Sequence, residues 1–322
     1  MGTKYGKSGR PFLQIPGPTL VPERVTRAMS QPLIDHRGPK FVILLREVLE
    51  GLKGIFQTED GHILLFPGSG TGAWEACVVN TLSPGDRVLG CVNGHFSTLF
   101  CQTAKAFGID VETLEVPYGA GIPAELVEER LREDRDRQFK AILFVHNETS
   151  TGVTSNVAAI RQAMDRSGHS ALLLVDVVSS LATTDFQFDQ WKVDVALAAP
   201  QKGLMLPPGM TILAVSKKAL QASTSAKCPK SFWDWGPVLE RNAIGEFPYT
   251  PATILLFGLK ESLAILTEET LPHVFRRHNR LAEACRRAVQ GMGLKLFARN
   301  PHEYSDTVTA VCIPEGYDSD SY

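Results

Sequence analysis

The segment Val193-Asp-Val-Ala-Leu-Ala-Ala-Pro-Gln-Lys-Gly-Leu204 contains the lysine on which the expected fold and site depend. A short apolar run with strand character ends here and leads Lys202 into a turn flanked by glycine. Lysine is disfavoured at the end of a buried strand because its ammonium group loses hydration there. The same loss lowers the pKa of the amine, and a lysine of this kind can form a Schiff base.

A carboxylate stands in a similar position upstream, where the apolar run 171–175 ends in Asp176. A lysine and an aspartate at two strand ends are the pair that a pyridoxal phosphate (PLP) site requires. The lysine holds the aldehyde of the cofactor, and the aspartate pairs with its protonated pyridine nitrogen. The alternative is a solvated loop lysine together with an aspartate that caps a helix.

The composition excludes several classes of protein. The chain has 322 residues, 43% of them hydrophobic and 21% charged, which is typical of a globular protein with one or two domains. A formal net charge of −2 favours neither nucleic acid nor an anionic membrane as a partner. No apolar run has membrane-spanning length, and the six cysteines lack the spacing of metal ligands. We therefore expect reduced thiols and an intracellular protein.

Apolar runs of strand length alternate with amphipathic segments along most of the chain, which predicts an α/β fold. An amphipathic helix is expected over 41–56, and the strands expected are 63–66, 87–92, 111–116, 141–145, 171–175, 193–198 and 211–215. Such strands, apolar throughout, indicate a mostly parallel sheet of the seven-stranded type with helices on both faces. Ligands of these sheets bind beyond the carboxyl ends of the strands.

The turn Gly68-Ser-Gly-Thr-Gly72 follows one strand and precedes a helix, as an anion-binding turn does. Its small residues let backbone N–H groups approach a phosphate, and the hydroxyls of Ser69 and Thr71 add donors. The glycine spacing differs from that of mononucleotide and dinucleotide loops. Ordinary turn chemistry remains the alternative explanation.

Two further strand ends offer side chains to the same edge of the sheet. In Asn93-Gly-His-Phe96, Phe96 or His95 is placed to stack on a flat cofactor; the alternative is that Phe96 simply packs in the core. Thr149, in His146-Asn-Glu-Thr149, is placed to bond a phenolic oxygen or to cap a turn. Agreement among several strand ends favours a cofactor site over these local alternatives.

The chain divides into three predicted parts. Residues 1–15 are polar and are expected to form an N-terminal arm, 16–260 a large PLP-binding domain, and 261–322 a partial small C-terminal α+β domain. Strands are expected over 294–297 and 307–313, the second because it alternates apolar and polar residues. The chain ends soon after that strand, which is why this domain is expected to be incomplete.

These motifs together resemble those of class V, fold-type I PLP-dependent aminotransferases, most closely the serine–glyoxylate and alanine–glyoxylate group. Similarity runs in register from about residue 12 to 322. It is carried by Pro16-Gly-Pro18, Gly68-Ser-Gly-Thr-Gly-Ala-Trp-Glu75, Val145-His-Asn-Glu-Thr-Ser-Thr-Gly-Val-Thr-Ser155, Leu174-Val-Asp176, Gln201-Lys-Gly-Leu204 and Phe247-Pro-Tyr-Thr-Pro251.

The resemblance implies roles for individual residues. Lys202 would form the Schiff base and then act as the general acid–base, while Asp176 would keep the pyridine nitrogen protonated. Phe96 would stack on the ring and Thr149 would bond its O3′ oxygen. The phosphate would be held by Ser69, Gly70, Thr71 and Gln201. Thr250 would reach the phosphate in a neighbouring subunit, so that the working unit would be a homodimer.

The activity implied is transfer of an amino group from L-serine or L-alanine to glyoxylate, giving hydroxypyruvate or pyruvate and glycine. Two features depart from the family pattern: Pro200 replaces a serine, and Phe247 replaces a tyrosine that binds phosphate in some relatives. Relatives also continue beyond the position of Tyr322 with a segment that carries the arginine for the substrate carboxylate.

That departure keeps two alternatives open. One is a catalytically impaired PLP-binding homologue. The other is a PLP-dependent lyase or desulfurase of the same fold, for which Cys312 would be the candidate nucleophile, although its strand pattern favours a core position. The expected compartment is the cytoplasm, with the peroxisome as an alternative because some relatives are found there.

Overall fold

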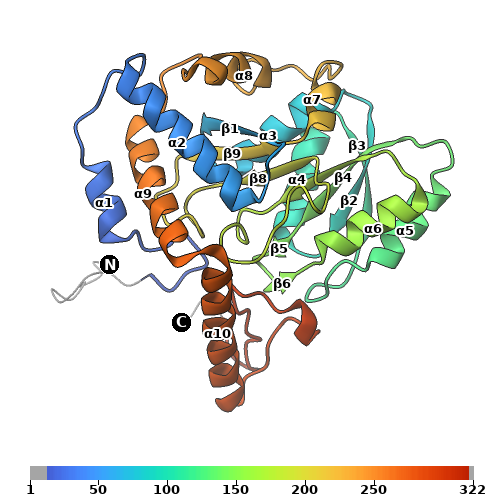
Figure 1. The fold of residues 1–322 in the computed structure, drawn as a ribbon. Helices are drawn as coiled ribbons and strands as arrows, with labels where there is room; N and C mark the ends of the chain where they lie inside the picture. Colours follow the sequence, from blue (N-terminus) through green and yellow to red (C-terminus); the bar gives the residue numbers. More distant parts are fainter. Residues whose placement is uncertain (1–12, 319–322) are drawn as a thin grey trace, which may run out of the picture.

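The structure, a computed structural model, describes residues 13–318 and contains a seven-stranded sheet at its centre (Figure 1). The strand order across the sheet is β1-β9-β8-β7-β4-β2-β3. The strands are β1 (His62–Pro67), β2 (Arg87–Val92), β3 (Asp110–Glu115), β4 (Phe139–Val145), β7 (Leu172–Asp176), β8 (Val195–Ala198) and β9 (Met210–Val215). A separate two-stranded ribbon is formed by β5 (Asn147–Glu148) and β6 (Val153–Thr154). Of the predicted N-terminal arm, residues 1–12 lie outside the described part of the chain.

Every strand of the large sheet except β9 runs in the same direction. β9 pairs antiparallel with both of its neighbours, β1 and β8, whereas the other neighbouring strands pair parallel. The register sets Val145 beside Asp176, and Asp176 beside Leu197. The carboxyl ends of β4, β7 and β8 therefore finish side by side, which is the arrangement predicted from the apolar runs.

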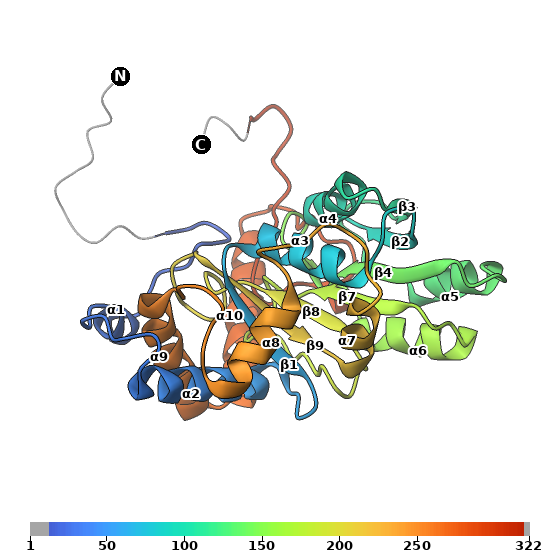
Figure 2. The ribbon, with the colours of Figure 1, turned by 90° about the horizontal axis from the view of Figure 1, so that it is seen from above.

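The sheet is covered on both faces (Figure 2). Alternate strand residues point to opposite sides, so that Ile63 and Leu65 belong to one buried cluster and Leu64 and Phe66 to the other. The first cluster packs on α2 (Pro39–Phe56), α5 (Ala124–Glu133), α6 (Val157–Ser167) and α9 (Thr253–Glu269). The second packs on α3 (Gly70–Thr81), α4 (His95–Ala106), α7 (Lys217–Ser223) and α8 (Trp235–Ile244). The predicted α/β architecture is confirmed.

The helix α2 shows how the sequence produces these layers. Pro39 occupies its first turn, where a missing N–H costs nothing, and the helix ends at Gln57, which has a left-handed backbone. Phe41, Leu45 and other apolar residues at three- and four-residue spacing face the sheet. The opposite side of α2 is exposed and carries Ile43 and several charged residues.

The last part of the described chain extends away from the sheet on α10 (Leu271–Gly291), as Figure 1 shows. The strands predicted over 294–297 and 307–313 are wrong as continuous elements: they meet in one antiparallel bridge between Leu296 and Val311. Two backbone bonds, from Phe297 N–H to Ala310 and from Cys312 N–H to Lys295, flank that bridge. Alternation alone predicted a strand, but the described segment finds a pairing partner over only a few residues. The domain boundaries at 16 and 261 remain predictions.

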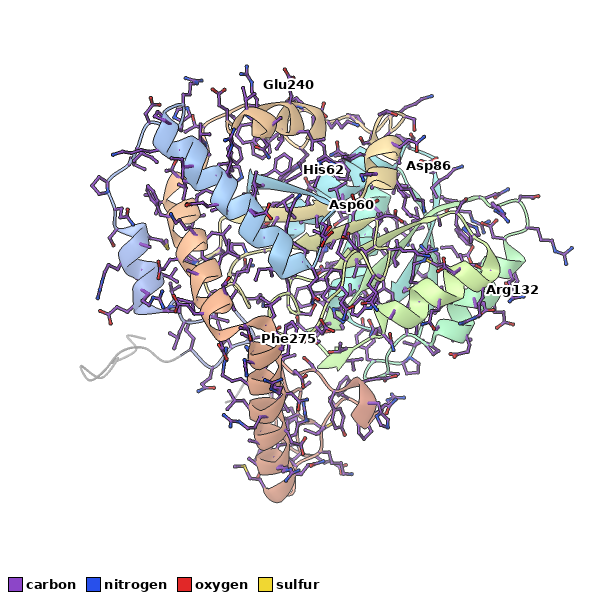
Figure 3. The ribbon with its side chains drawn as sticks, viewed as in Figure 1. Asp60, His62, Asp86, Arg132, Glu240 and Phe275 are labelled. Atoms are coloured by element: carbon purple, nitrogen blue, oxygen red, sulfur yellow. The ribbon has the colours of Figure 1, made fainter. Side chains whose placement is uncertain are left out.

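The remaining short elements lie at the periphery, and charged side chains surround the fold (Figure 3). The short elements are the helix α1 (Glu23–Met29) and a 3₁₀ turn at Pro301–Glu303. Asp60, in the turn that leads into β1, forms an exposed ion pair with Lys217 at 2.6 Å. Across residues 13–318, no helix combines the length and apolarity needed to span a bilayer.

The packing of α2 gives a first prediction. Leu45→Ala removes a side chain that is 0% exposed and leaves a cavity against the sheet, so we expect the free energy of unfolding to fall by about 2–5 kcal/mol. Ile43→Ala, on a side chain that is 58% exposed, should change it by less than about 0.5 kcal/mol. Urea unfolding followed by circular dichroism measures both; equal losses would contradict this packing.

Candidate active site

A cavity of about 190 Å³ lies beyond the carboxyl edge of the sheet, where the segments that follow β1, β2, β4, β7 and β8 meet. Its walls contain every residue predicted for the site except Thr250. The lining residues are Ser69, Gly70, Thr71, Trp74, Phe96, Val145, Asn147, Thr149, Asp176, Val178, Ser179, Gln201 and Lys202. Thr250 lies exposed in the segment before α9 and does not line the cavity of its own chain.

Asp176 is the most buried ionisable group in this wall, with 5% of its surface exposed. One carboxylate oxygen accepts the backbone N–H of Val178 at 2.8 Å, and the other accepts the indole N–H of Trp74 at 2.6 Å. Burial raises the pKa of Asp176 to about 6, and the two hydrogen bonds oppose that rise. The carboxylate is therefore held in a fixed orientation and is mostly ionised at neutral pH.

Lys202 reaches the same cavity from the turn after β8 and is half-buried. Its Nζ donates to the carbonyl oxygen of Pro16 at 2.7 Å. Burial lowers the pKa of Lys202, with the negative charge of Asp176 acting in the opposite direction. Gly17 lies against this side chain: its φ is +136°, and a Cβ there would come within 2.5 Å of Nζ. Only glycine fits at this contact.

The N-terminus of α3 forms another wall and is open to an anion. The Ser69 hydroxyl accepts the N–H of Gly72 at 3.2 Å and caps the helix. The backbone bonds of α3 begin with the N–H of Ala73, which bonds the carbonyl of Ser69. The N–H groups of Gly70 and Thr71 come before it, and neither has a hydrogen-bond partner among the described residues. Free N–H groups at the positive end of a helix suit a phosphate.

Two polar groups in the cavity have no protein partner to satisfy them. The Oε1 atom of Gln201 is buried without a hydrogen bond, and the hydroxyl of Thr149 makes none within residues 13–318. An unsatisfied buried amide oxygen is costly, so its presence indicates a site built for a polar ligand. A cavity of about 150 Å³ holds one benzene ring. The volume, the open α3 terminus and the buried Asp176 all fit PLP.

The N-terminus of α4, which carries Phe96, is closed by the buried carboxylate of Glu148. That carboxylate accepts the N–H groups of Phe96 at 3.3 Å and Ser97 at 2.9 Å. It also accepts the N–H and the hydroxyl of Ser150, at 3.1 Å and 2.7 Å. Gly94 leaves the space for it, because a Cβ there would collide with the Glu148 side chain. Glu148 thus joins α4 to the loop that contains Thr149.

A second cavity, of about 250 Å³, adjoins the first, and Thr149, Ser179 and Lys202 line both. Its other walls come from the N-terminal segment at Pro16, Thr19 and Leu20, from α9 and α10, and from the region of Thr307. Most of these side chains are short hydroxyls or aliphatic groups. The chamber is therefore suited to a small ligand that reaches Lys202.

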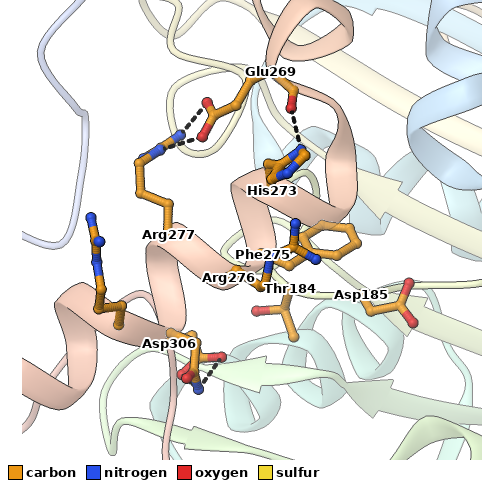
Figure 4. Close-up of a pocket in the computed structure, with 10 residues that line it drawn as sticks. Thr184, Asp185, Glu269, His273, Phe275, Arg276, Arg277 and Asp306 are labelled. Atoms are coloured by element: carbon orange, nitrogen blue, oxygen red, sulfur yellow. Dashed lines mark hydrogen bonds and ion pairs between the residues drawn. The ribbon is translucent and has the colours of Figure 1, made fainter.

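A larger open groove, of about 900 Å³, lies along α10 and contains none of the predicted site residues (Figure 4). An ion pair and a further side-chain hydrogen bond lie within the groove. Arg277 forms two hydrogen bonds with the Glu269 carboxylate, at 2.7 Å and 2.9 Å, and Asp306 accepts from Asn279. Nothing in this groove resembles a catalytic group beside a buried cavity.

Sequence reasoning missed three residues of the site. Trp74, Asn147 and Glu148 all stand inside the motifs quoted above, but the motifs alone predict no role for them. A tryptophan one turn into the helix after a glycine-rich turn is a usable signal for Trp74, whereas Glu148 had none. Cys312, the alternative nucleophile, lies outside both cavities and has its thiol against the carbonyl of Leu296 at 3.7 Å.

Comparison with known proteins places the chain in a family. Residues 12–321 match the family Aminotransferase class-V. The chain belongs to the class-V aminotransferases. It is 47% identical to a serine–glyoxylate aminotransferase of Methylorubrum extorquens, covering 97% of this chain and 79% of that protein. It is 45% identical to an L-aspartate–glyoxylate aminotransferase of Paracoccus denitrificans, covering 95% and 77%. The predicted assignment to PLP-dependent aminotransferases is confirmed.

Solved structures agree. An alanine–glyoxylate aminotransferase from Nostoc sp. superposes with a TM-score of 0.90 at 29% identity, covering 99% of this chain and 84% of that one. An aspartate aminotransferase from Thermus thermophilus superposes with a TM-score of 0.86 at 30% identity, covering 95% and 83%. These comparisons confirm the predicted fold and favour transamination over the impaired and lyase alternatives.

The raised pKa of Asp176 gives a prediction for the protein without added PLP. The folded state holds the Asp176 proton up to about pH 6, whereas an unfolded aspartate loses it near pH 3.9. The folded state therefore loses stability as the pH rises through that window. Between pH 4 and 8, wild type should lose on the order of 2–3 kcal/mol more unfolding free energy than Asp176→Asn.

Urea unfolding at several pH values gives this difference, and the pH-independent cost of the new amide cancels from it. Asp306→Asn is the comparison: partial burial also raises the pKa of Asp306, which lies outside the cavity that contains Asp176, so this variant should remove only a smaller part of the same loss. Parallel pH curves for wild type and Asp176→Asn would show that Asp176 is not a buried carboxylate of raised pKa.

Proposed function

We propose that this protein transfers an amino group from L-serine, or L-alanine, to glyoxylate, giving hydroxypyruvate, or pyruvate, and glycine. The observation that carries the proposal is the meeting of Lys202 and Asp176 in one cavity, beside the open N-terminus of α3. The same cavity supports PLP as the cofactor. Relatives at 45–47% identity that use glyoxylate support the acceptor.

PLP, when bound, would supply an aldehyde able to carry the amino group and a ring that acts as an electron sink. Lys202 has the amine that would hold the cofactor, and its half-buried position favours the neutral amine that can accept and return a proton. The Asp176 carboxylate, fixed by two N–H donors, would pair with a protonated ring nitrogen. Both groups act from rigid strand ends, which limits their movement during turnover.

The other lining residues would bind and orient the cofactor. The N–H groups of Gly70 and Thr71, the hydroxyl of Ser69 and the amide of Gln201 offer donors to a phosphate. Phe96 would cover one ring face, held there by Glu148, and the free hydroxyl of Thr149 would bond the O3′ oxygen. Exclusion of water by these walls strengthens the electrostatic interactions inside the cavity.

Two features support a homodimer as the working unit. Lys202 is the only lysine or arginine that lines the smaller cavity, so within the described chain a phosphate there has hydrogen-bond donors but no second cation. Thr250 is exposed and outside its own cavity, where a hydroxyl is free to reach another subunit. We propose that Thr250 contacts the phosphate in the partner.

The cytoplasm remains the proposed compartment, with the peroxisome as an alternative.

The shape of the second cavity, beside Lys202, supports the proposal that the amino donor is small. Its walls offer hydroxyls, such as Thr183 and Thr307, and aliphatic side chains. Arg277, the arginine that lines it, is already paired with Glu269. Serine and alanine, whose side chains are small and uncharged, suit walls of this kind.

Absorbance spectroscopy tests the assignment of Lys202. Wild type incubated with PLP should show a visible band of lysine-bound cofactor and should consume serine only when glyoxylate is present. Lys202→Ala should lose the band and reduce turnover by more than about 1,000-fold. Lys217→Ala, at an exposed lysine paired with Asp60, should retain both. A band that survives in Lys202→Ala would overturn the assignment, and faster turnover of aspartate than serine would overturn the donor.

Mixed dimers test the role of Thr250. Thr250→Val should weaken PLP binding about 10- to 100-fold, because the phosphate loses a charge-assisted hydrogen bond. A heterodimer of Lys202→Ala and Thr250→Val subunits should regain one site of wild-type affinity, made from Lys202 of one subunit and Thr250 of the other. Differently tagged subunits, co-expressed and purified in tandem, provide that heterodimer. Only weak sites in it would place Thr250 in its own subunit's site.

A further inference from the structure

The indole of Trp74 makes a specific contact with the proposed cofactor site that the function alone does not account for. Trp74 is 4% exposed and lies in the second turn of α3. Its N–H donates to Asp176 at 2.6 Å, across 102 residues of sequence. A hydrogen bond from an N–H to an ionised carboxylate is short and about twice as strong as a neutral one. This distance is at the short end of that class.

The contact stabilises one protonation state of Asp176. The carboxylate is buried, and the charges that act on it are Glu148, which favours the protonated form, and Lys202, which favours the ionised form. The N–H of Val178 bonds the opposite oxygen but comes from the same loop as Asp176. Trp74 is thus the donor supplied by a different element, and it fixes the carboxylate relative to α3.

The surroundings of Trp74 hold the donor still. Its ring stacks on Phe100, with centroids 5.8 Å apart and planes 15° from parallel. The side chain begins one helical turn after Gly70 and Thr71, whose free N–H groups form the proposed phosphate site. One rigid helix therefore sets both the phosphate end of the cavity and the orientation of the carboxylate at its other end.

We propose that Trp74 is a positioning residue: its indole N–H orients Asp176 and keeps it ionised for a protonated ring nitrogen. This inference rests on the proposed PLP-dependent function. Trp74→Phe tests it, because phenylalanine keeps an aromatic ring beside Phe100 but lacks the N–H, together with part of the indole volume. We expect PLP to bind about 10- to 100-fold more weakly, with a lower kcat and little change in KM.

The pH dependence separates positioning from packing. Without the indole donor, Asp176 should hold its proton to a higher pH. As the pH is lowered, Trp74→Phe should therefore lose PLP affinity at a higher pH than wild type does. Trp235→Phe is the matched control, because it makes the same change at another buried tryptophan, which lies outside the cavity. Its PLP affinity and pH midpoint should equal those of wild type.

The outcomes distinguish this inference from the proposed function. Wild type that binds PLP through Lys202, with an unchanged affinity and pH midpoint in Trp74→Phe, would overturn the role of Trp74 alone. Wild type that fails to bind PLP would overturn the function. Should Trp74→Phe not fold, NMR of protein labelled with ¹⁵N at tryptophan tests the contact instead. One indole N–H signal is expected to shift with pH in wild type and to stay constant in Asp176→Asn. Absence of such a signal contradicts the proposal.

Discussion

A carboxylate buried at the end of β7 is the constraint on which the rest of the site depends. Removing Asp176 from water disfavours its charge, and the fold compensates with an N–H donor on each oxygen and with Lys202 in the same cavity. The compensation requires α3, the β7 loop and the turn after β8 to be in fixed positions together. The parallel register of β4, β7 and β8 provides that, because their carboxyl ends finish side by side.

The two helix N-termini at this edge are treated differently, and the difference explains where a charged ligand would bind. At α3 the N–H groups of Gly70 and Thr71 are free. At α4 the first N–H, of His95, bonds the Ser150 hydroxyl, and the next two, of Phe96 and Ser97, bond the buried carboxylate of Glu148. An internal anion at one helix and an open terminus at the other direct a phosphate to α3 and leave Phe96 to contact a ring.

Much of this arrangement could be predicted from the sequence. The apolar run ending near Ala198 became β8, and the rule that ligands bind at carboxyl strand ends brought Lys202 and Asp176 together. Trp74 and Glu148 could not be found in this way, because their roles depend on contacts between elements distant in sequence. The strand predicted over 307–313 was wrong for a related reason. Alternating apolar and polar residues show that one side of a segment can be buried, but a strand also needs a hydrogen-bonded partner along its length.

One lysine, Lys202, lies beside the cavity that contains the Asp176 carboxylate and that we propose binds the PLP ring. Borohydride reduction of the PLP-treated protein, followed by peptide mapping with mass spectrometry, tests that claim most directly, because reduction makes the lysine–cofactor bond permanent. We expect a pyridoxyl label on the peptide that contains Lys202, and on no other lysine, at stoichiometric PLP. A label on another lysine, or a stoichiometric complex that leaves Lys202 unlabelled, would contradict it.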